Sequence, residues 1–235
     1  MLLCLDAGNT RLKYGLHDGD EWRARGALDH ADSDTLERQL PARPERIVAC
    51  NVAGETARQR IEALAAKLRI PLDWLSSSPI ACGVSNGYDR PQQLGADRWA
   101  ALIGARALHG DACVVVMAGT ATTVDMLDAR GHFLGGMILP GLALMRSALA
   151  SNTADLPHAS GHFRALATNT DDAIVSGVLH ATLGAIERVR ATRPPGLTCL
   201  LSGGAAVELA PHVTPPIRVV DNLVLEGLAQ YGLGR

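Results

Sequence analysis

The sequence predicts a mixed α/β protein built from two similar halves. An apolar run that ends in a glycine turn occurs twice, at Leu2–Lys13 and at Val114–Asp125, with Gly8 and Gly119 about half a chain length apart. After each copy the chain repeats one order of elements, which is strands, then helix, strand and helix. The repeated order predicts a mixed sheet in each half, with the boundary near residues 110–113.

In the first half, an apolar run predicts the strand Leu2–Leu5, and Arg11–Gly15 could be its antiparallel neighbour. Gly54 ends a later apolar run, and apolar residues at helical spacing follow it in Glu55–Leu68. The same spacing predicts a helix at Asp97–His109. The other elements expected here are a short helix at Asp34–Leu40, strands at Arg46–Val52 and Pro71–Trp74, and a loop at Gly83–Gln93.

In the second half, the apolar run Cys113–Val116 predicts a strand. Turn residues at 128–131 predict a hairpin between Thr123–Leu127 and His132–Ile138, and Pro140-Gly141 then interrupts the strand pattern. The other elements expected here are helices at Leu142–Leu149, Asp171–Arg190 and Asp221–Tyr231, a strand at Thr198–Leu201, and a polar loop at Asn152–Thr170.

Composition restricts the class of protein. The chain has 235 residues, 47% of them hydrophobic and 20% charged, so it can bury an ordinary core as one large domain or two small ones. The net charge of −2 and the aromatic content of 3% argue against nucleic-acid binding. Five scattered cysteines without a Cys-x-x-Cys pair suit a reducing compartment. No apolar stretch reaches the ~20 residues that span a bilayer, so we expect a cytoplasmic protein with no membrane partner.

The two glycine turns are candidate phosphate-binding loops, because glycine lets backbone N–H groups approach a ligand closely. Asp6 ends the first apolar run, where its carboxylate could hold Mg²⁺ against a phosphate. Lys13 would add a point charge on a phosphate. Asp6 could instead only support the turn, and Lys13 could be an ordinary exposed lysine. Two such turns in similar halves predict a nucleotide held between domains.

A second group of residues predicts a substrate pocket. Gly95-Ala96-Asp97-Arg98 follows a flexible loop and opens a helix. Asp97 could be a cap or a partner of the helix dipole, but Arg98 next to it offers a cation for an anionic substrate. Tyr88 lies just upstream and adds a phenol. In the second half, Ser202–Ala205 could bring bare backbone against a flat ligand, or could be a simple strand-end turn.

The order and spacing of these motifs resemble the type III pantothenate kinases, some of which are named Bvg accessory factors. The motifs that carry the resemblance are Asp6-x-Gly8-Asn9-Thr10-x-x-Lys13, Gly95-x-Asp97-Arg98, Gly119-Thr120-Ala121-x-Thr123-x-Asp125 and Gly135-Gly136-x-Ile138-x-Pro140-Gly141. The segments that also fit are Asn169-Thr170, Ser202-Gly203-Gly204 and the tail Leu223-Val224-Leu225-Glu226-Gly227-Leu228. Together they cover essentially the whole chain.

The resemblance implies a fold of the acetate kinase, sugar kinase, heat-shock chaperone and actin superfamily. Two ribonuclease-H-like domains would face an ATP cleft, with residues 1–112 carrying the first phosphate loop and the pantothenate motif. Residues 113–235 would carry the second phosphate loop and an adenosine-side turn. The implied reaction converts ATP and pantothenate to ADP and 4′-phosphopantothenate, the first step of coenzyme A synthesis. Members of the family are homodimers in which the partner chain helps to complete the pantothenate pocket.

The resemblance also implies roles for individual residues. Asp97 would be the general base that accepts the proton of the pantothenate hydroxyl, and Asp6 would lie near Mg²⁺. The implied ATP-binding residues are Asp6, Ala7, Gly8, Asn9, Thr10, Arg11, Leu12, Lys13 and Thr120. The implied pantothenate-binding residues are Tyr88, Gly95, Ala96, Asp97, Arg98 and Thr170.

One position departs from the family. The family usually has an aspartate two residues before the glycine of Gly-Thr-Ala, and that aspartate binds a monovalent cation such as K⁺ or NH₄⁺. Here the position is Met117, which the internal duplication aligns with Asp6. A thioether is a poor ligand for a hard cation, so we expect no K⁺ site at this position. Either the cation is not needed, or another oxygen holds it, such as that of Asp125.

Two other functions remain open from the sequence. The chain could be a non-catalytic accessory or regulatory protein on the same fold, or another small-molecule kinase or a phosphatase of the superfamily. Met117 slightly favours the accessory role, whereas the intact set of Asp6, Lys13, Asp97 and Arg98 favours the kinase.

Overall fold

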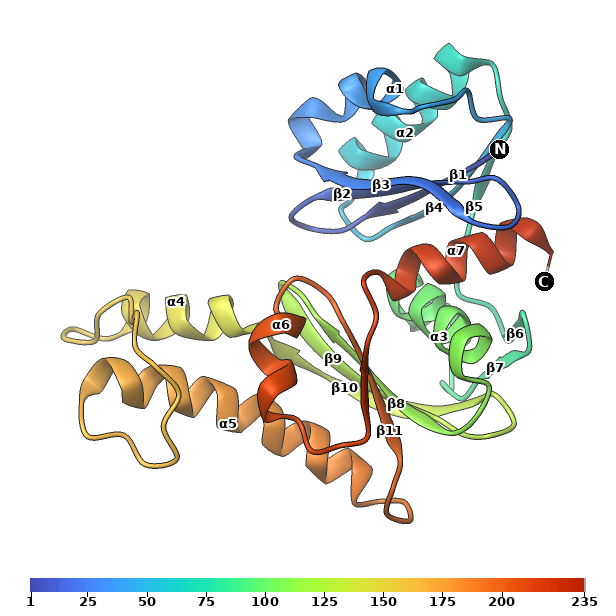
Figure 1. The fold of residues 1–235 in the computed structure, drawn as a ribbon. Helices are drawn as coiled ribbons and strands as arrows, with labels where there is room; N and C mark the ends of the chain where they lie inside the picture. Colours follow the sequence, from blue (N-terminus) through green and yellow to red (C-terminus); the bar gives the residue numbers. More distant parts are fainter. Residues whose placement is uncertain (235) are drawn as a thin grey trace. The chain divides into compact units, whose positions relative to one another are not determined.

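The computed structural model describes residues 1–234 and divides into two compact units. The first unit contains residues 1–111, residues 128–134 and the described residues from Asn222 onward. The second contains residues 112–127 and 135–221. Each unit is a mixed α/β structure with a central sheet, as predicted (Figure 1).

The sheet of the first unit has five strands in the order β3-β2-β1-β4-β5. β1 runs antiparallel to β2 and parallel to β4, and β4 is parallel to β5. The strand bounds are β1 Leu2–Ala7, β2 Leu12–His17, β3 Trp22–Leu28, β4 Arg46–Asn51 and β5 Leu72–Trp74. The predicted antiparallel pairing of the first two strands is confirmed.

Helices pack on both faces of this sheet (Figure 1). Leu3 and Leu5 of β1 belong to a core cluster with Ile61 of α2, while α7 contacts β1 and β4 from the opposite face. Because side chains alternate along a strand, Asp6 lies on the α7 face of β1. The helices of this unit are the 3₁₀ turn η1 at His30–Thr35, α1 Leu36–Gln39, α2 Glu55–Leu68, the 3₁₀ turn η2 at Pro91–Gln93, α3 Ala96–His109 and α7 Leu223–Leu233.

Two short strands, β6 Ile80–Ala81 and β7 Val84–Asn86, complete the first unit. β7 pairs with His132 and Phe133 at the start of β10. The sequence predicts a loop throughout Gly83–Gln93, but Val84–Asn86 is a strand. This short pairing is a tertiary contact, which local hydrophobic periodicity does not predict.

The second unit repeats the topology of the first. Its strands follow the order β12-β11-β8-β9-β10. Read from β10, this order matches β3-β2-β1-β4-β5, with the first strand of each unit at the centre. β8 is antiparallel to β9 and parallel to β11, as β1 is to β2 and β4. The strand bounds are β8 Cys113–Ala118, β9 Ala121–Leu127, β10 His132–Pro140, β11 Thr198–Ser202 and β12 Ile217–Val219. The duplication read from the two glycine turns is therefore confirmed by topology.

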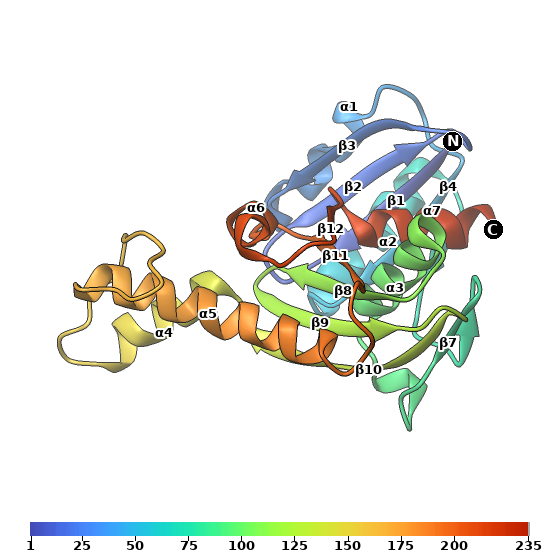
Figure 2. The ribbon, with the colours of Figure 1, turned by 60° about the horizontal axis from the view of Figure 1, so that its bottom comes forward.

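Two helices lie side by side in the second unit, α4 at Leu142–Asn152 and α5 at Thr170–Arg190 (Figures 1 and 2). Ile174 and Val178 of α5 belong to one core cluster with apolar residues of β8 and β9. The remaining helical segments are α6 Ala206–Leu209 and the 3₁₀ turn η3 at Ala210–His212. No helix within residues 1–234 has the length and apolarity to cross a membrane.

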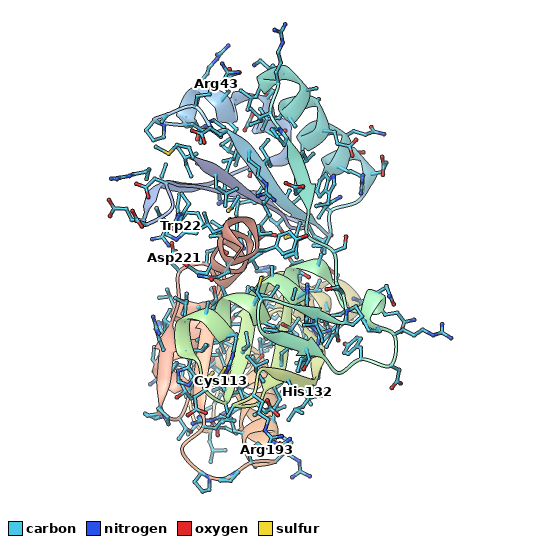
Figure 3. All side chains as sticks on the ribbon, turned by 90° about the vertical axis from the view of Figure 1, so that its right-hand side faces the viewer. Trp22, Arg43, Cys113, His132, Arg193 and Asp221 are labelled. Atoms are coloured by element: carbon cyan, nitrogen blue, oxygen red, sulfur yellow. The ribbon has the colours of Figure 1, made fainter. Side chains whose placement is uncertain are left out.

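The strand β3 was missed by the sequence analysis. Its residues Trp22-Arg23-Ala24-Arg25 alternate between half-buried and exposed, so it lacks a continuous apolar run. Pairing with β2 and the hydrogen bond from Trp22 Nε1 to Glu226 Oε1 of α7, at 2.9 Å, hold it in place. Figure 3 shows Trp22 next to α7.

Candidate active site

A charged row crosses the centre of the first sheet. The strand register pairs Asp6 with Lys13 on one side and with Cys50 on the other, so the three side chains share one face. Lys13 Nζ lies 3.6 Å from Asp6 Oδ2, and Cys50 Sγ donates to Asp6 Oδ1 at 3.6 Å. Asp6 is 3% exposed, whereas the side chain of Lys13 is 35% exposed. The row therefore joins a buried carboxylate to a cation that solvent and ligands can reach.

The charges around this row oppose one another. Burial raises the pKa of Asp6, the Lys13 ammonium lowers it, and the nearby Asp97 carboxylate raises it again. Burial also raises the pKa of the Cys50 thiol, and the charges of Asp6 and Asp97 add to that effect. The thiol therefore stays protonated and acts as a donor. Two carboxylates near one lysine leave an excess of negative charge, which suits a divalent cation bound with an anionic ligand.

The first candidate phosphate loop follows directly on β1. The N–H of Gly8 donates to the Arg11 carbonyl at 3.2 Å and closes the turn between β1 and β2. Asn9 and Thr10 at the tip are exposed. The tip of the loop is therefore open to solvent, within the same unit as Asp6 and Lys13.

The predicted substrate motif lies at the beginning of α3. Asp97 is half-buried in the first turn of the helix. Its Oδ1 accepts a hydrogen bond from the backbone N–H of Arg98 at 2.8 Å. Arg98 is 4% exposed and donates through its guanidinium to Tyr88 Oη at 2.8 Å. The Arg98 guanidinium also lies over the rings of Tyr88 and Phe133, at 5.6 and 5.8 Å from their centroids. A buried cation with aromatic walls is suited to an anionic substrate group.

Two residues of this unit were missed by the sequence analysis. Cys50 was treated only as one of five scattered cysteines, and Phe133 only as part of a strand. Both join the site through strand pairing, Cys50 beside β1 and Phe133 beside β7. Their distance along the chain from Asp6 and from Tyr88 hides the relation in the sequence.

The second glycine loop joins β8 to β9 in the second unit. The N–H of Gly119 donates to the Ala121 carbonyl at 3.0 Å, and Thr120 at the tip is exposed. The N–H of Gly141 donates to the Thr120 carbonyl at 2.9 Å. Gly203 has a positive φ of 104°, and a Cβ there would meet the backbone of Ala118, so the Ser202–Ala205 turn packs against the end of β8. The backbone at Gly141 and Gly203 thus packs against this second loop and the end of β8.

Strand register places Met117 in the position that Asp6 has in the first unit. Met117 pairs with Thr123 of β9 and with Ser202 of β11, as Asp6 pairs with Lys13 and Cys50. The second row is therefore neutral, with a thioether between two hydroxyls. These atoms do not fit a hard monovalent cation, because the central ligand is sulfur.

Asp125, the alternative cation ligand, is 1% exposed and pairs with Val115 in the sheet. A Cβ on Gly136 would collide with the Asp125 carboxylate, so that glycine leaves room for the side chain. Asp125 and Thr123 lie on one face of β9, since they are separated by one residue. Within residues 1–234 there is no group of three or more His, Cys, Asp or Glu that could hold a metal ion.

Thr170, the remaining predicted substrate residue, begins α5 in the second unit. Asn169 caps that helix, because its side-chain oxygen accepts from the Asp172 N–H at 2.9 Å. Thr170 is exposed and lines a groove of about 1250 Å³ between α4 and α5. The first unit thus holds Asp6, Lys13, Asp97, Arg98 and Tyr88, while the second holds Thr120 and Thr170.

Comparisons with known proteins agree on one family. A sequence model of the type III pantothenate kinases matches residues 2–192. The type III pantothenate kinase of Aromatoleum aromaticum is 53% identical over 233 residues, covering 97% of this chain and 96% of the relative. That of Dechloromonas aromatica is 48% identical over 236 residues, covering 99% of both chains.

Solved structures with lower identity show the same fold. A Campylobacter jejuni protein, described as a Baf family transcriptional activator, matches with a TM-score of 0.67 at 22% identity, over 97% of this chain and 96% of that one. A Sinorhizobium meliloti protein, described as a 2-dehydro-3-deoxygalactonokinase, matches with a TM-score of 0.64 at 16% identity, over 99% of both. These matches and the duplicated sheet confirm the expected kinase-superfamily fold of two ribonuclease-H-like domains. With more than half the chain matched, this protein belongs to the type III pantothenate kinase family.

Proposed function

We propose that this chain transfers the γ-phosphoryl group of ATP to the hydroxyl of pantothenate, and so makes 4′-phosphopantothenate for coenzyme A synthesis. The observation that carries the proposal is the complete charged set of the first unit. Asp6, Lys13 and Asp97 interact electrostatically, and Arg98 is buried beside Tyr88. Membership of the kinase family supports the same activity.

Asp97 is proposed as the general base. Its carboxylate takes the proton of the pantothenate hydroxyl as that oxygen forms a bond to the γ-phosphorus. The bond between the γ-phosphorus and the bridging oxygen breaks, and ADP leaves with the electron pair. Little covalent chemistry is needed from the protein, so positioning and charge stabilisation carry most of the rate.

The remaining residues hold the two substrates. Lys13 and the backbone of the Gly8 loop bind the phosphates, and Thr120 contacts the nucleotide from the second loop. Arg98 and Tyr88 bind pantothenate, whose carboxylate suits a buried guanidinium. Asp6 is suited to Mg²⁺ because one carboxylate plus phosphate oxygens is a common donor set for that ion. When bound, Mg²⁺ would neutralise charge that develops on the phosphates.

We further propose that catalysis by this chain needs no monovalent cation at the second loop. Met117 replaces the usual aspartate there, and its neighbours Thr123 and Ser202 bring no charge. The carboxylate of Asp125 is the alternative oxygen ligand, and a strong K⁺ response of the native enzyme would favour it.

The groove between α4 and α5 is proposed as the face that a second copy of the chain covers. Its lining is mostly apolar or small, and Thr170 is one of the lining residues. Leu144 in the groove is 49% exposed and Ile138 on the preceding strand is 63% exposed. Exposed apolar side chains gathered in one region commonly mark an interface between proteins. A Leu144→Glu variant should then become monomeric in light scattering, whereas a dimer of unchanged mass would contradict the proposal.

The activity is tested by incubating the protein with ATP, Mg²⁺ and pantothenate and detecting 4′-phosphopantothenate by mass spectrometry. Asp97→Asn keeps the size of the side chain but removes the base, so product should disappear while ATP binding survives. Turnover of that variant within a few-fold of the native enzyme would exclude Asp97 as the base. Absence of product from the native protein in K⁺, NH₄⁺ or Na⁺ salts would favour the accessory-protein function instead.

A further inference from the structure

His30 makes a direct contact with the first phosphate loop. Its Nε2 lies 2.7 Å from the carbonyl oxygen of Gly8. A carbonyl can only accept, so Nε2 carries the proton and donates it. His30 is half-buried in η1, a segment that follows β3, and belongs to the same unit as the loop.

His30 is itself held from behind. Its carbonyl oxygen accepts hydrogen bonds from the Ser33 hydroxyl, at 3.0 Å, and from the guanidinium of Arg60 on α2. The residue before it, Asp29, forms an ion pair with Arg11 at the other end of the loop, with Nε and Oδ1 3.4 Å apart. That pair is largely exposed and contributes little energy. His30 is thus held through its own backbone carbonyl, by the 3₁₀ turn through Ser33 and by α2 through Arg60.

The contact to Gly8 matters because of peptide geometry. The carbonyl of Gly8 and the N–H of Asn9 belong to one planar trans peptide, so they point in opposite directions. Gly8 has no Cβ, and rotation of this peptide is therefore sterically cheap. Rotation would turn a carbonyl toward any phosphate bound at the loop in place of an N–H. A hydrogen bond that fixes the carbonyl also fixes the direction of the donor.

We propose that His30 is a positioning residue that locks the Gly8–Asn9 peptide with the Asn9 N–H available to a phosphate oxygen of the nucleotide. This inference rests on the proposed ATP-binding role of the loop. His30 does not touch the ligand and acts only through Gly8. Prior fixing of the peptide spares the ordering cost that a mobile loop would incur on each binding event.

The test compares three variants by isothermal titration with Mg-ATP and with adenosine. His30→Ala removes the donor and should weaken ATP binding about 3- to 10-fold, the range that one hydrogen bond carries. Adenosine, which has no phosphate, should bind all three variants and the native protein equally. His30→Gln places an amide nitrogen the same number of bonds from Cβ as Nε2, so it should restore ATP affinity to within about twofold. His30→Asn is shorter by one bond and should not.

Arg58→Ala serves as a control on the supporting helix, because Arg58 pairs with Glu62 and stacks on Trp74, away from the contacts that hold His30. It should leave ATP affinity unchanged. Should His30→Ala fail to fold, His30→Asn against His30→Gln carries the same comparison.

The outcomes separate the two proposals. Equal ATP affinity in the native protein and in both His30→Ala and His30→Asn would overturn the positioning role of His30. A loss of adenosine affinity as large as the loss of ATP affinity would overturn it too. A native protein that binds ATP in a His30-dependent way but forms no 4′-phosphopantothenate would overturn the proposed function and leave the positioning role supported. A native protein that binds no ATP would overturn both.

Discussion

The contact between α3 and α7 depends on a glycine, and enlarging it should destabilise the protein. A Cβ on Gly227 of α7 would lie 2.6 Å from the carbonyl carbon of Ala100 on α3 and 3.0 Å from its Cα, and closer still to its carbonyl oxygen. Carbon atoms normally approach to about 3.5–4.0 Å. Gly227→Ala must therefore push the two helices apart by about 1 Å, because both clashing partners are backbone.

The size of the effect follows from two opposing terms. Overpacking of a closed core costs about 1–3 kcal/mol. Replacement of a glycine inside a helix by alanine returns about 1 kcal/mol. The clash with backbone places the cost near the upper end, so the net loss in the free energy of unfolding is about 1–2 kcal/mol. For a chain of this length, that loss lowers the melting temperature by about 2–8 °C.

Gly184→Ala is the matched control for this prediction. Gly184 is exposed in the interior of α5, and a Cβ there would meet nothing within 4 Å. The helical term then acts alone and should stabilise the protein by about 0.5–1 kcal/mol. Thermal melts followed by circular dichroism should shift in opposite directions for the two variants. A Gly227→Ala protein that melts at or above the native temperature would show that α3 and α7 can accommodate a Cβ at this position.

Three further predictions follow from other contacts. Cys50→Ala removes the donor to Asp6 and should raise the Mg²⁺ concentration needed for half-maximal rate about 3- to 10-fold, whereas Cys50→Ser should retain most of the native response. Equal dependence of the rate on Mg²⁺ in the native protein and both variants would exclude a role for the Cys50 donor. Met117→Asp places a carboxylate between two hydroxyls and should create a K⁺-dependent rise in both rate and melting temperature, and a native enzyme that already needs K⁺ would contradict it. The N–H of His162 bonds to the carboxylate of Asp172 and holds its pKa below the ordinary value, so this support is present above about pH 4 and is lost as the pH falls through the folded-state pKa. The protection factor of the His162 amide, which is the exchange rate of an unprotected amide at the same pH divided by its own rate, should therefore fall as the pH is lowered below about 4. At neutral pH it should also fall in Asp172→Ala, and a protection factor that ignores both changes would show that the contact does not protect this amide.

The candidate site was predicted from the sequence only in part. Asp6, Lys13, Asp97 and Arg98 stand in short motifs whose local pattern suggested phosphate and substrate binding. Their assignment to ATP and pantothenate came from the family resemblance, and the roles of the single residues remain proposals. Thr120 and Thr170 were expected by the same route.

The sequence alone determined the elements that rest on local periodicity and the duplication that rests on repeated glycine turns. Apolar runs and helical spacing are patterns within a few neighbouring residues, so they can be recognised without a structure. Which residues meet across the sheets depends on long-range pairing and packing. The tertiary structure sets Cys50 beside Asp6, His30 against Gly8, and Met117 between Thr123 and Ser202. These contacts join residues far apart in the chain, and the free energy that selects them comes from pairing and burial, which no single stretch of sequence contains.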